Sequence, residues 1–318
     1  MSVTAPQPFE WVPVEGPDAA ALKRMAQAFP KPADPMGEAW FMSSERKIYS
    51  ELLGDLDAVP DGDLAKALEE IASGTSSFGP SAEWTKWYHY LLPRLMGRSW
   101  KPTYFDQGEL LFTAFMVQHP SAENDFAYDG FRSDVLATLG RYIMSPKFWP
   151  DGKLDPERCL GKRKGPTGIA GWSDAGPLLS ASLLFCIKYL PANRIEPWFR
   201  SAIAIADRSW QAQIATWLVG AHALLTDEIA QPSQFPESGT FGIRWSWSHI
   251  LDGDGTGQRE GAVQNRPFLP DDSRRIVLRI ARDWDVEETL EAFMTDPETR
   301  SATQEVTRLP ESFLQLYR

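Results

Sequence analysis

The stretch from Gly176 to Leu190 reads Gly-Pro-Leu-Leu-Ser-Ala-Ser-Leu-Leu-Phe-Cys-Ile-Lys-Tyr-Leu. From Leu178 onward its one charged residue is Lys188, so a helix here is apolar on nearly every face and must be covered on several sides. Because the helix is too short to cross a lipid bilayer, other parts of the protein must provide that cover. The stretch therefore predicts a globular protein whose helices pack around this segment.

A second apolar helix is expected directly after this one. Pro191 breaks the chain, and a helix beginning near Asn193 or Glu196 and ending at Leu225 would carry one apolar stripe. The stripe consists of Ile203, Ala206, Trp210, Ile214, Trp217, Ala221 and Leu224. Since the link at Pro191 is short, the two helices should form an antiparallel hairpin.

Apolar spacing predicts further helices along most of the chain. They cover residues 18–29, 38–53, 61–74, 81–95, 106–119, 131–144, 271–284 and 286–294, with a last amphipathic turn around 313–317. Gly74 is expected to stop one helix, Ser81 to cap the next, and Pro93 to kink or split it. The predicted fold is all-α, a multi-helix antiparallel array and a degenerate HEAT-like helical repeat.

The same patterns predict how the chain is divided. Residues 1–17 hold four prolines among apolar residues and should form an extended N-terminal arm on the body. Residues 18–225 are expected to form a helical-repeat body, 226–270 an irregular segment rich in aromatic residues and glycine, and 271–318 C-terminal helices packed on the body. Together they should make a single domain.

The net charge of −11 and pI near 5.0 argue against nucleic-acid binding, which needs a basic surface. An acidic surface suits either solubility or a basic partner. Cys159 and Cys186 make neither a disulfide framework nor a metal site, and Cys186 is expected to be buried. The N-terminus lacks a signal-peptide pattern, which predicts a cytoplasmic protein without a membrane partner. Thirteen tryptophans indicate either bulky helix packing or an aromatic binding surface.

Three aromatic motifs carry a resemblance to a known group of proteins. They are Trp-Tyr-His-Tyr-Leu-Leu-Pro-Arg at 87–94, Phe-Arg-Ser-Asp-Val-Leu at 131–136 and Met-Ser-Pro-Lys-Phe-Trp at 144–149. The region of residues 84–149, roughly a fifth of the chain, resembles uncharacterised helical proteins of bacterial polymorphic toxin and immunity loci. The resemblance implies an α-helical, repeat-like, non-catalytic protein that neutralises or escorts a partner. It transfers no functional residues.

The irregular segment provides the candidate binding residues, since a long irregular segment in a compact protein is often functional. Within Phe241–Ile250 the residues alternate with period two, which is typical of a strand, although a short helix remains an alternative. We select the aromatic residues of this stretch and the acidic residues that follow it as the binding set: Trp245, Trp247, His249, Asp252 and Asp254.

The sequence patterns that could bind an ion or a cofactor are incomplete. Residues 252–260 place oxygen ligands like a calcium loop, but Val263 stands where a bidentate carboxylate is needed, so a solvated acidic turn is the alternative. The glycines at 253, 255 and 257 lack a surrounding parallel sheet, and the basic loop 161–168 lacks a phosphate-loop ending. We therefore predict no metal and no cofactor.

The remaining polar residues have ordinary interpretations. His89, His119, His222 and His249 form no metal-ligand pair on one helix face, and hydrolase signatures are absent, so no catalytic residue is predicted. His222 is expected to be a structural imidazole. The arginines at 274, 275, 279 and 282 indicate a solvated helix face with acidic neighbours, or a patch for phosphate or an acidic partner.

Three functions compete at this point. The first is a non-catalytic protein-binding module, with an acidic immunity or inhibitor protein that neutralises a basic partner such as a toxin as a special case. The alternative is an α/α-barrel carbohydrate-active enzyme whose tryptophans line a cleft. A nucleic-acid binder using the arginine face is the third, and the acidic total disfavours it.

Overall fold

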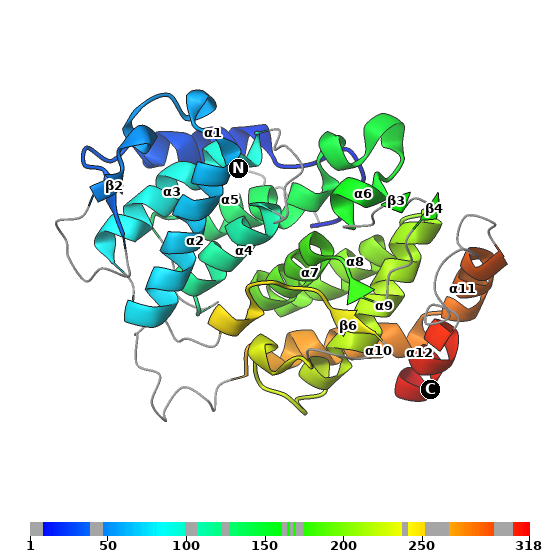
Figure 1. Ribbon diagram of the computed structural model, residues 1–318. Helices are drawn as coiled ribbons and strands as arrows, with labels where there is room; N and C mark the ends of the chain where they lie inside the picture. The colour runs from blue at the N-terminus through cyan, green and yellow to red at the C-terminus, as the bar shows by residue number, and fades with distance from the viewer. Residues whose placement is uncertain are drawn as a thin grey trace, which may run out of the picture.

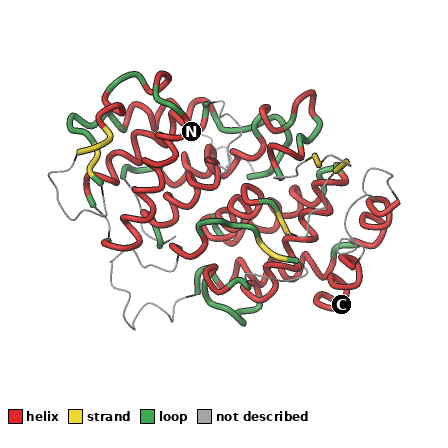
Figure 2. The backbone as a smooth tube through the Cα atoms, viewed as in Figure 1, coloured by secondary structure: helices red, strands yellow, loops and turns green. Residues whose placement is uncertain are grey.

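The computed structural model describes residues 9–38, 47–79, 81–98, 107–121, 127–160, 164–165, 168–169, 174–236, 241–251, 267–295 and 308–318. Within these residues the chain is mainly helical (Figure 1), and strands are confined to short segments (Figure 2). The structure confirms the predicted all-α class with many helices. Whether those helices form a repeat stays a prediction.

The described residues contain twelve α-helices. In chain order they are α1 (Ala19–Ala28), α2 (Asp61–Phe78), α3 (Ala82–Met96), α4 (Gln107–Gln118), α5 (Phe131–Thr138), α6 (Pro156–Cys159), α7 (Pro177–Tyr189), α8 (Ala192–Ile203), α9 (Arg208–Leu225), α10 (Asp271–Asp283), α11 (Val286–Thr295) and α12 (Leu309–Tyr317).

Short 3₁₀ helices and strands connect the α-helices. The 3₁₀ helices are η1 (Ser50–Leu53), η2 (Leu56–Ala58), η3 (Leu139–Met144), η4 (Pro146–Phe148), η5 (Pro150–Gly152), η6 (Pro232–Gln234) and η7 (Ser248–Ile250). The strands pair two by two: β1 (Met36–Gly37) with β2 (Lys47–Tyr49) and β3 (Lys164–Gly165) with β4 (Gly168–Ile169) are antiparallel, and β5 (Asp174–Ala175) with β6 (Gly242–Ile243) is parallel.

Helix α7 lies in the middle of the molecule (Figure 1) and packs against α4, α10 and η3. Every residue from Leu178 to Tyr189 is buried, so the apolar segment is covered by helices as its sequence predicts. Pro177 occupies the first turn, where its missing N–H costs nothing. The charge of Lys188 is accommodated because its Nζ donates to the carbonyl oxygen of Phe268 at 2.8 Å and lies 4.0 Å from the centre of that ring.

The described part of the N-terminal arm lies on the helices. Trp11 is 2% exposed, and its indole Nε1 donates to the Gly140 carbonyl oxygen at 2.8 Å. Its backbone N–H donates to Ser201 Oγ at 2.9 Å, and its ring makes edge contacts with Trp198 and Trp210. The arm is therefore part of the packed core at Trp11.

The helix predicted over 38–53 is wrong in its described part. Residues 47–49 form strand β2, which pairs with β1, and residues 50–53 form η1. The cause is tertiary: Glu83 of α3 accepts hydrogen bonds from the backbone N–H of Gly37 and from the Lys47 ammonium. These bonds hold the β1–β2 pair against α3, which overrides the helical spacing of the apolar residues. Residues 39–46 lie outside the described part of the chain.

Helix ends differ from the prediction at two places. Helix α2 continues past Gly74 to Phe78, and Gly79, with φ of 86°, follows its end. An interior glycine costs a helix only about 1 kcal/mol, and packing of α2 on α4 outweighs it. Ser81 caps α3 as predicted, since its Oγ accepts from the Glu83 N–H at 3.3 Å. Helix α10 begins at Asp271 as predicted and ends at Asp283, one residue before the predicted end.

Two predicted single helices divide differently. The helix expected to run from 193 to 225 is two helices, α8 and α9, because the chain turns at residues 204–207 and Asp207 caps α9 by accepting from the Trp210 N–H at 2.9 Å. The helix expected over 131–144 changes from α5 to the tighter η3 at Leu139. In contrast, α3 passes through Pro93 and ends at Met96.

Candidate functional site

Residues 241–251, here called the strap, hold three of the five predicted binding residues. The strap begins as β6, which pairs in parallel with β5, and ends in η7. It crosses α9 at Gly220, where a Cβ atom would lie 2.8 Å from the backbone carbonyl carbon of Gly242. Glycine at position 220 therefore lets the strap lie directly on the helix.

Helix α4 anchors the strap from beneath. The indole Nε1 of Trp245 donates to Thr113 Oγ1 at 2.9 Å, and that hydroxyl donates to the Glu109 carbonyl oxygen at 2.9 Å. The backbone N–H of Trp247 donates to Glu109 Oε1 at 3.2 Å, although Glu109 is only 1% exposed. Since Trp245 is itself 5% exposed, it acts as an anchor for the strap and presents little surface to a partner.

The exposed surface of the strap is provided by its second half. Trp247 is half-buried and His249 is exposed, with 6.1 Å between their ring centroids. The predicted alternation holds in the first half, where Phe241 and Trp245 are buried and Arg244 is exposed. Both predicted alternatives therefore describe part of the strap: strand β6 at its start and the 3₁₀ helix η7 near its end.

Several predictions fall outside the described residues. Asp252 and Asp254 do, and with them the loop 252–260 and its calcium interpretation. Of the basic loop 161–168, the structure describes the backbone at 164–165 and 168, which belongs to the β3–β4 pair. These sites remain predictions.

Tryptophan serves mainly as packing material among the described residues. Six indoles belong to the largest fully buried side chains: Trp11, Trp87, Trp149, Trp198, Trp210 and Trp217. Three of them contact one another, because Trp11 lies 5.2 Å from Trp198 and 5.8 Å from Trp210 between ring centroids. Of the two interpretations of the tryptophan content, helix packing therefore accounts for these six.

The structure brings together two histidines that sequence spacing does not connect. His89 of α3 and His119, which directly follows α4, place their Nε2 atoms 3.1 Å apart. Their rings are nearly parallel, with 7° between the planes and 5.3 Å between centroids. Phe29 stacks on His89 at 4.5 Å, and the edge of Phe131 contacts both imidazoles. The position of His89 inside the aromatic run 87–90 is the one sequence feature that marks this residue. Its pairing with His119 has no sequence signal, because residues that face each other from different helices have no fixed spacing along the chain.

Burial keeps both imidazoles neutral. It lowers the pKa of His89 to about 4. Burial first, and the neighbouring His89 second, lower the pKa of His119 to about 3. Near neutral pH the pair therefore shares one Nε2 proton, with one ring donating and the other accepting.

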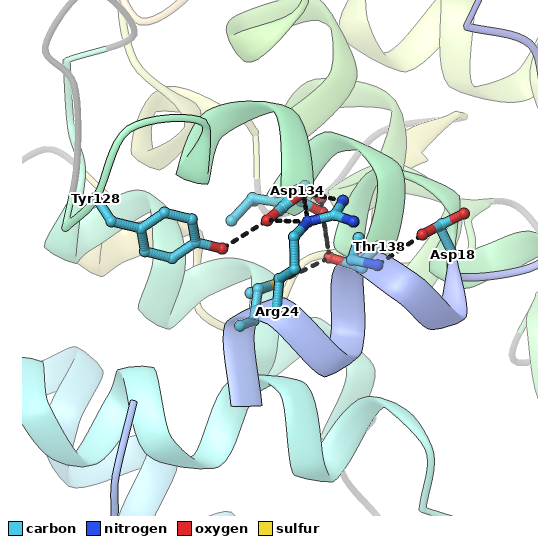
Figure 3. Close-up of polar contacts among 8 residues, drawn as sticks. Asp18, Arg24, Tyr128, Asp134 and Thr138 are labelled. Carbon is cyan, nitrogen blue, oxygen red and sulfur yellow. Dashed lines mark hydrogen bonds and ion pairs between the residues drawn. The ribbon is translucent and has the colours of Figure 1, made fainter. Parts of the chain in front are cut away.

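A buried carboxylate joins α1 to α5 near this pair (Figure 3). Asp134 accepts hydrogen bonds from Arg24 Nη2 at 2.6 Å and from the Tyr128 hydroxyl at 2.7 Å, and Figure 3 shows it between these two side chains. Burial, followed by the hydrogen bond and the charge of Asp134, raises the pKa of Tyr128. Because Tyr128 also packs on Phe29 and Phe131, this cluster borders the histidine pair and explains how its aromatic walls are held.

A cleft of about 360 Å³ lies beside α3, between it and the η1–η2 segment. Its cations are already used for structure. Arg94 donates to the carbonyl oxygens of Tyr90 and Ala26 and stacks on the Tyr90 ring at 3.9 Å. Arg98 donates to two carbonyl oxygens of the segment and to Asp61 Oδ1 at 3.0 Å. The hydrogen bonds of Arg98 therefore hold the η1–η2 segment on the end of α3.

Three of the four arginines on α10 pair with neighbouring carboxylates. Arg274, with a side chain 9% exposed, pairs with Asp227 at 3.1 Å and with Asp271, while Arg279 pairs with Glu196 of α8. Arg275 lies within 3.9 Å of carboxylates of its own helix. This arrangement matches the solvated helix face rather than a patch for an acidic partner.

Negative charge gathers on one segment, residues 51–70, here called the acidic edge. It carries seven carboxylates and a single cation, Lys66. The carboxylates are Glu51, Asp55, Asp57, Asp61, Asp63, Glu69 and Glu70. Burial raises the pKa of the adjacent Tyr49, and four glutamates raise it further: Glu70, Glu38, Glu69 and Glu51. The local field at this edge is therefore negative.

Within the part of the chain that the structure describes, no helix is long and apolar enough to span a membrane. Those residues also contain no group of three or more His, Cys, Asp or Glu side chains arranged around a metal ion. Comparisons of the chain with protein families, with curated proteins and with solved structures find no match, so its function has to be argued from the sites above.

Proposed function

We propose that the chain is a non-catalytic binding protein that holds a basic protein partner against its acidic edge. An immunity or inhibitor protein that neutralises a basic toxin is the special case that the resemblance of residues 84–149 favours. The observation that carries the proposal is the concentration of seven carboxylates against one lysine in residues 51–70.

The construction of the edge supports this use. Arg98 and Lys31 donate to the carbonyl oxygens of Leu53, Leu56 and Val59, so this part of the edge is held in place before any partner arrives. Glu51, Asp55 and Asp57 are exposed at its surface. A rigid, predominantly acidic surface speeds encounter with a basic partner and loses little entropy on binding.

The carbohydrate-enzyme alternative loses part of its motivation. It rests on tryptophans that line a cleft, yet six of the thirteen are fully buried in the helix packing. The cleft beside α3 is lined by Lys31, Arg94 and Arg98, by Asp55 and Asp57, and by one tyrosine, Tyr90, but by no tryptophan. No described observation favours sugar binding over partner binding.

The proposal is tested by purifying the tagged full chain from its native host at low and high ionic strength. An edge variant with Glu51→Lys, Asp55→Lys and Asp57→Lys should bind the co-purifying basic protein about tenfold or more weakly, because like charges then face each other. Binding by the unmodified chain should weaken as salt increases.

A matched control separates this surface from total charge. Asp283→Lys, Glu288→Lys and Glu291→Lys change three exposed carboxylates near and on α11, and so alter the net charge equally. The control should retain the partner. Equal loss in both variants, a partner that is not basic, or no co-purifying protein under any salt condition would refute the proposal.

A further inference from the structure

We propose that His89 and His119 form a two-coordinate site for a soft monovalent cation, Cu(I), for which Ag(I) is the redox-inert probe. The site lies between α3 and the end of α4. It goes beyond the proposed function and does not depend on it.

The geometry of the two rings carries the argument. The 5.3 Å between their centroids nearly equals the 3.1 Å between the Nε2 atoms plus the two ring radii, so both nitrogens lie on the line that joins the rings. The ring planes are nearly parallel, with 7° between them, so the two Nε2 atoms face each other. This is the donor arrangement that a linear, two-coordinate ion requires.

Bond lengths show how far the rings must move. Metal–imidazole bonds are about 2.0 Å long, so a linear ion needs about 4 Å between the nitrogens. Each ring of the pair would retreat by about half an ångström. An ion with tetrahedral angles would instead sit off the line, out of the direction of both lone pairs. The described residues also provide no third ligand group for it.

The surroundings suit a soft monovalent ion. Phe29, Phe115 and Phe131 pack against the imidazoles at centroid distances between 4.5 and 5.8 Å, which limits water and offers ring faces to a cation. His119 directly follows the last residue of α4, where the helix dipole places partial negative charge. Both imidazoles are neutral at pH 7, as metal ligands must be.

The protons balance without an added reagent. In the metal-free pair, one ring carries its proton on Nε2 and the other on Nδ1. When the ion binds both Nε2 atoms, the Nε2 proton moves through solvent to Nδ1 of the same ring. Both rings end as neutral Nδ1–H tautomers, no net proton is released, and the complex has charge +1.

The test is titration of the full chain with Ag(I) in chloride-free buffer, and with Cu(I) under anaerobic competition with a chelator. The buried thiols of Cys159 and Cys186 are the chief competitors, so the titration uses a Cys159→Ala, Cys186→Ala background. We expect one equivalent to bind and to raise the Tm. His89→Phe or His119→Phe should weaken binding by about a hundredfold or more.

The chain provides its own controls. His222→Phe and His249→Phe remove the other two histidines and should leave Ag(I) binding unchanged. If a pair variant misfolds, ¹⁵N spectra of the unsubstituted imidazoles decide, because Ag(I) should shift both Nε2 resonances of the pair. Absence of binding, binding that survives the pair variants, unshifted Nε2 resonances, or equal uptake of Zn²⁺ at the pair would each overturn the inference.

Discussion

At the scale of single residues, the histidine pair links proton binding to stability. Its two pKa values, about 4 and about 3, lie below the ordinary value near 6.5 that each imidazole regains on unfolding. Between these values the unfolded chain binds more protons than the folded protein, so acid favours unfolding. The stabilising contribution is complete above pH 6.5 and is lost as pH falls toward the folded values.

We therefore expect the free energy of unfolding to fall by about 2 kcal/mol or more between pH 7.5 and 5 because of the pair. Urea unfolding at the two pH values measures this loss. The double variant His89→Phe, His119→Phe should show a loss smaller by that amount. Parallel pH dependence in the unsubstituted protein and the double variant would contradict the interpretation.

At the scale of elements, the strap shows how tertiary contacts reverse a local preference. Gly220 lies in the interior of α9, where replacement of glycine by alanine ordinarily stabilises a helix. Here a Cβ would lie 2.8 Å from the Gly242 carbonyl carbon and 3.0 Å from its oxygen. Because these are backbone atoms, either the helix or the strap must move.

Gly220→Ala should therefore lower the free energy of unfolding by about 1–3 kcal/mol and increase hydrogen exchange in the strap. Gly62→Ala in α2 is the matched control, because a Cβ added at Gly62 would meet no neighbouring group within 4 Å. That change should be neutral or stabilise by up to about 1 kcal/mol. Stabilisation by both substitutions would show that the strap backbone does not lie in close contact with α9 at Gly220.

Elements with a strong local signal are those that the sequence predicts well. Residues 177–189 are apolar, with proline at the first helical position, and form α7 within one residue of expectation. Residues 38–53 have helical apolar spacing too, yet residues 47–49 pair with β1 as strand β2, and Lys47 bonds to Glu83. The difference is that α7 satisfies its own backbone, whereas β2 depends on partners that are distant in sequence.

The candidate site was predicted in part. The strap was found from its aromatic alternation, but its attachment to Glu109 and Thr113, more than a hundred residues away in sequence, has no local signal. The same holds for His89 and His119, which lie on neighbouring helices. Side chains that face each other across two helices are related by packing, not by a fixed spacing along the chain.

At the scale of the whole molecule, α7 connects the packing of the chain. It contacts α4 and α10, and all its residues after Pro177 are buried. A side chain shortened at its centre would leave a cavity and deprive the neighbouring side chains of contacts. Stability should therefore be most sensitive to substitutions on this helix.

Leu184→Ala should lower the free energy of unfolding by about 2–5 kcal/mol, since Leu184 is fully buried. Leu278→Ala on α10 deletes the same atoms from a partly buried side chain and should cost clearly less. Denaturant unfolding of the two variants measures the difference, provided that the free energy of unfolding depends on denaturant concentration with the same slope in both. A cost below about 1 kcal/mol for Leu184→Ala would mean that α7 is not the centre of the packing.

The amino-acid sequence by itself determined the helical class, the buried segment at 177–189 and the excess of negative charge, because each follows from local composition and spacing. Tertiary structure alone decided that most of the described tryptophans are core residues, that the strap rests on Glu109, and that His89 meets His119. The physical reason is that burial and hydrogen bonding join residues by distance in space, and the chain brings distant residues together only after its helices have packed.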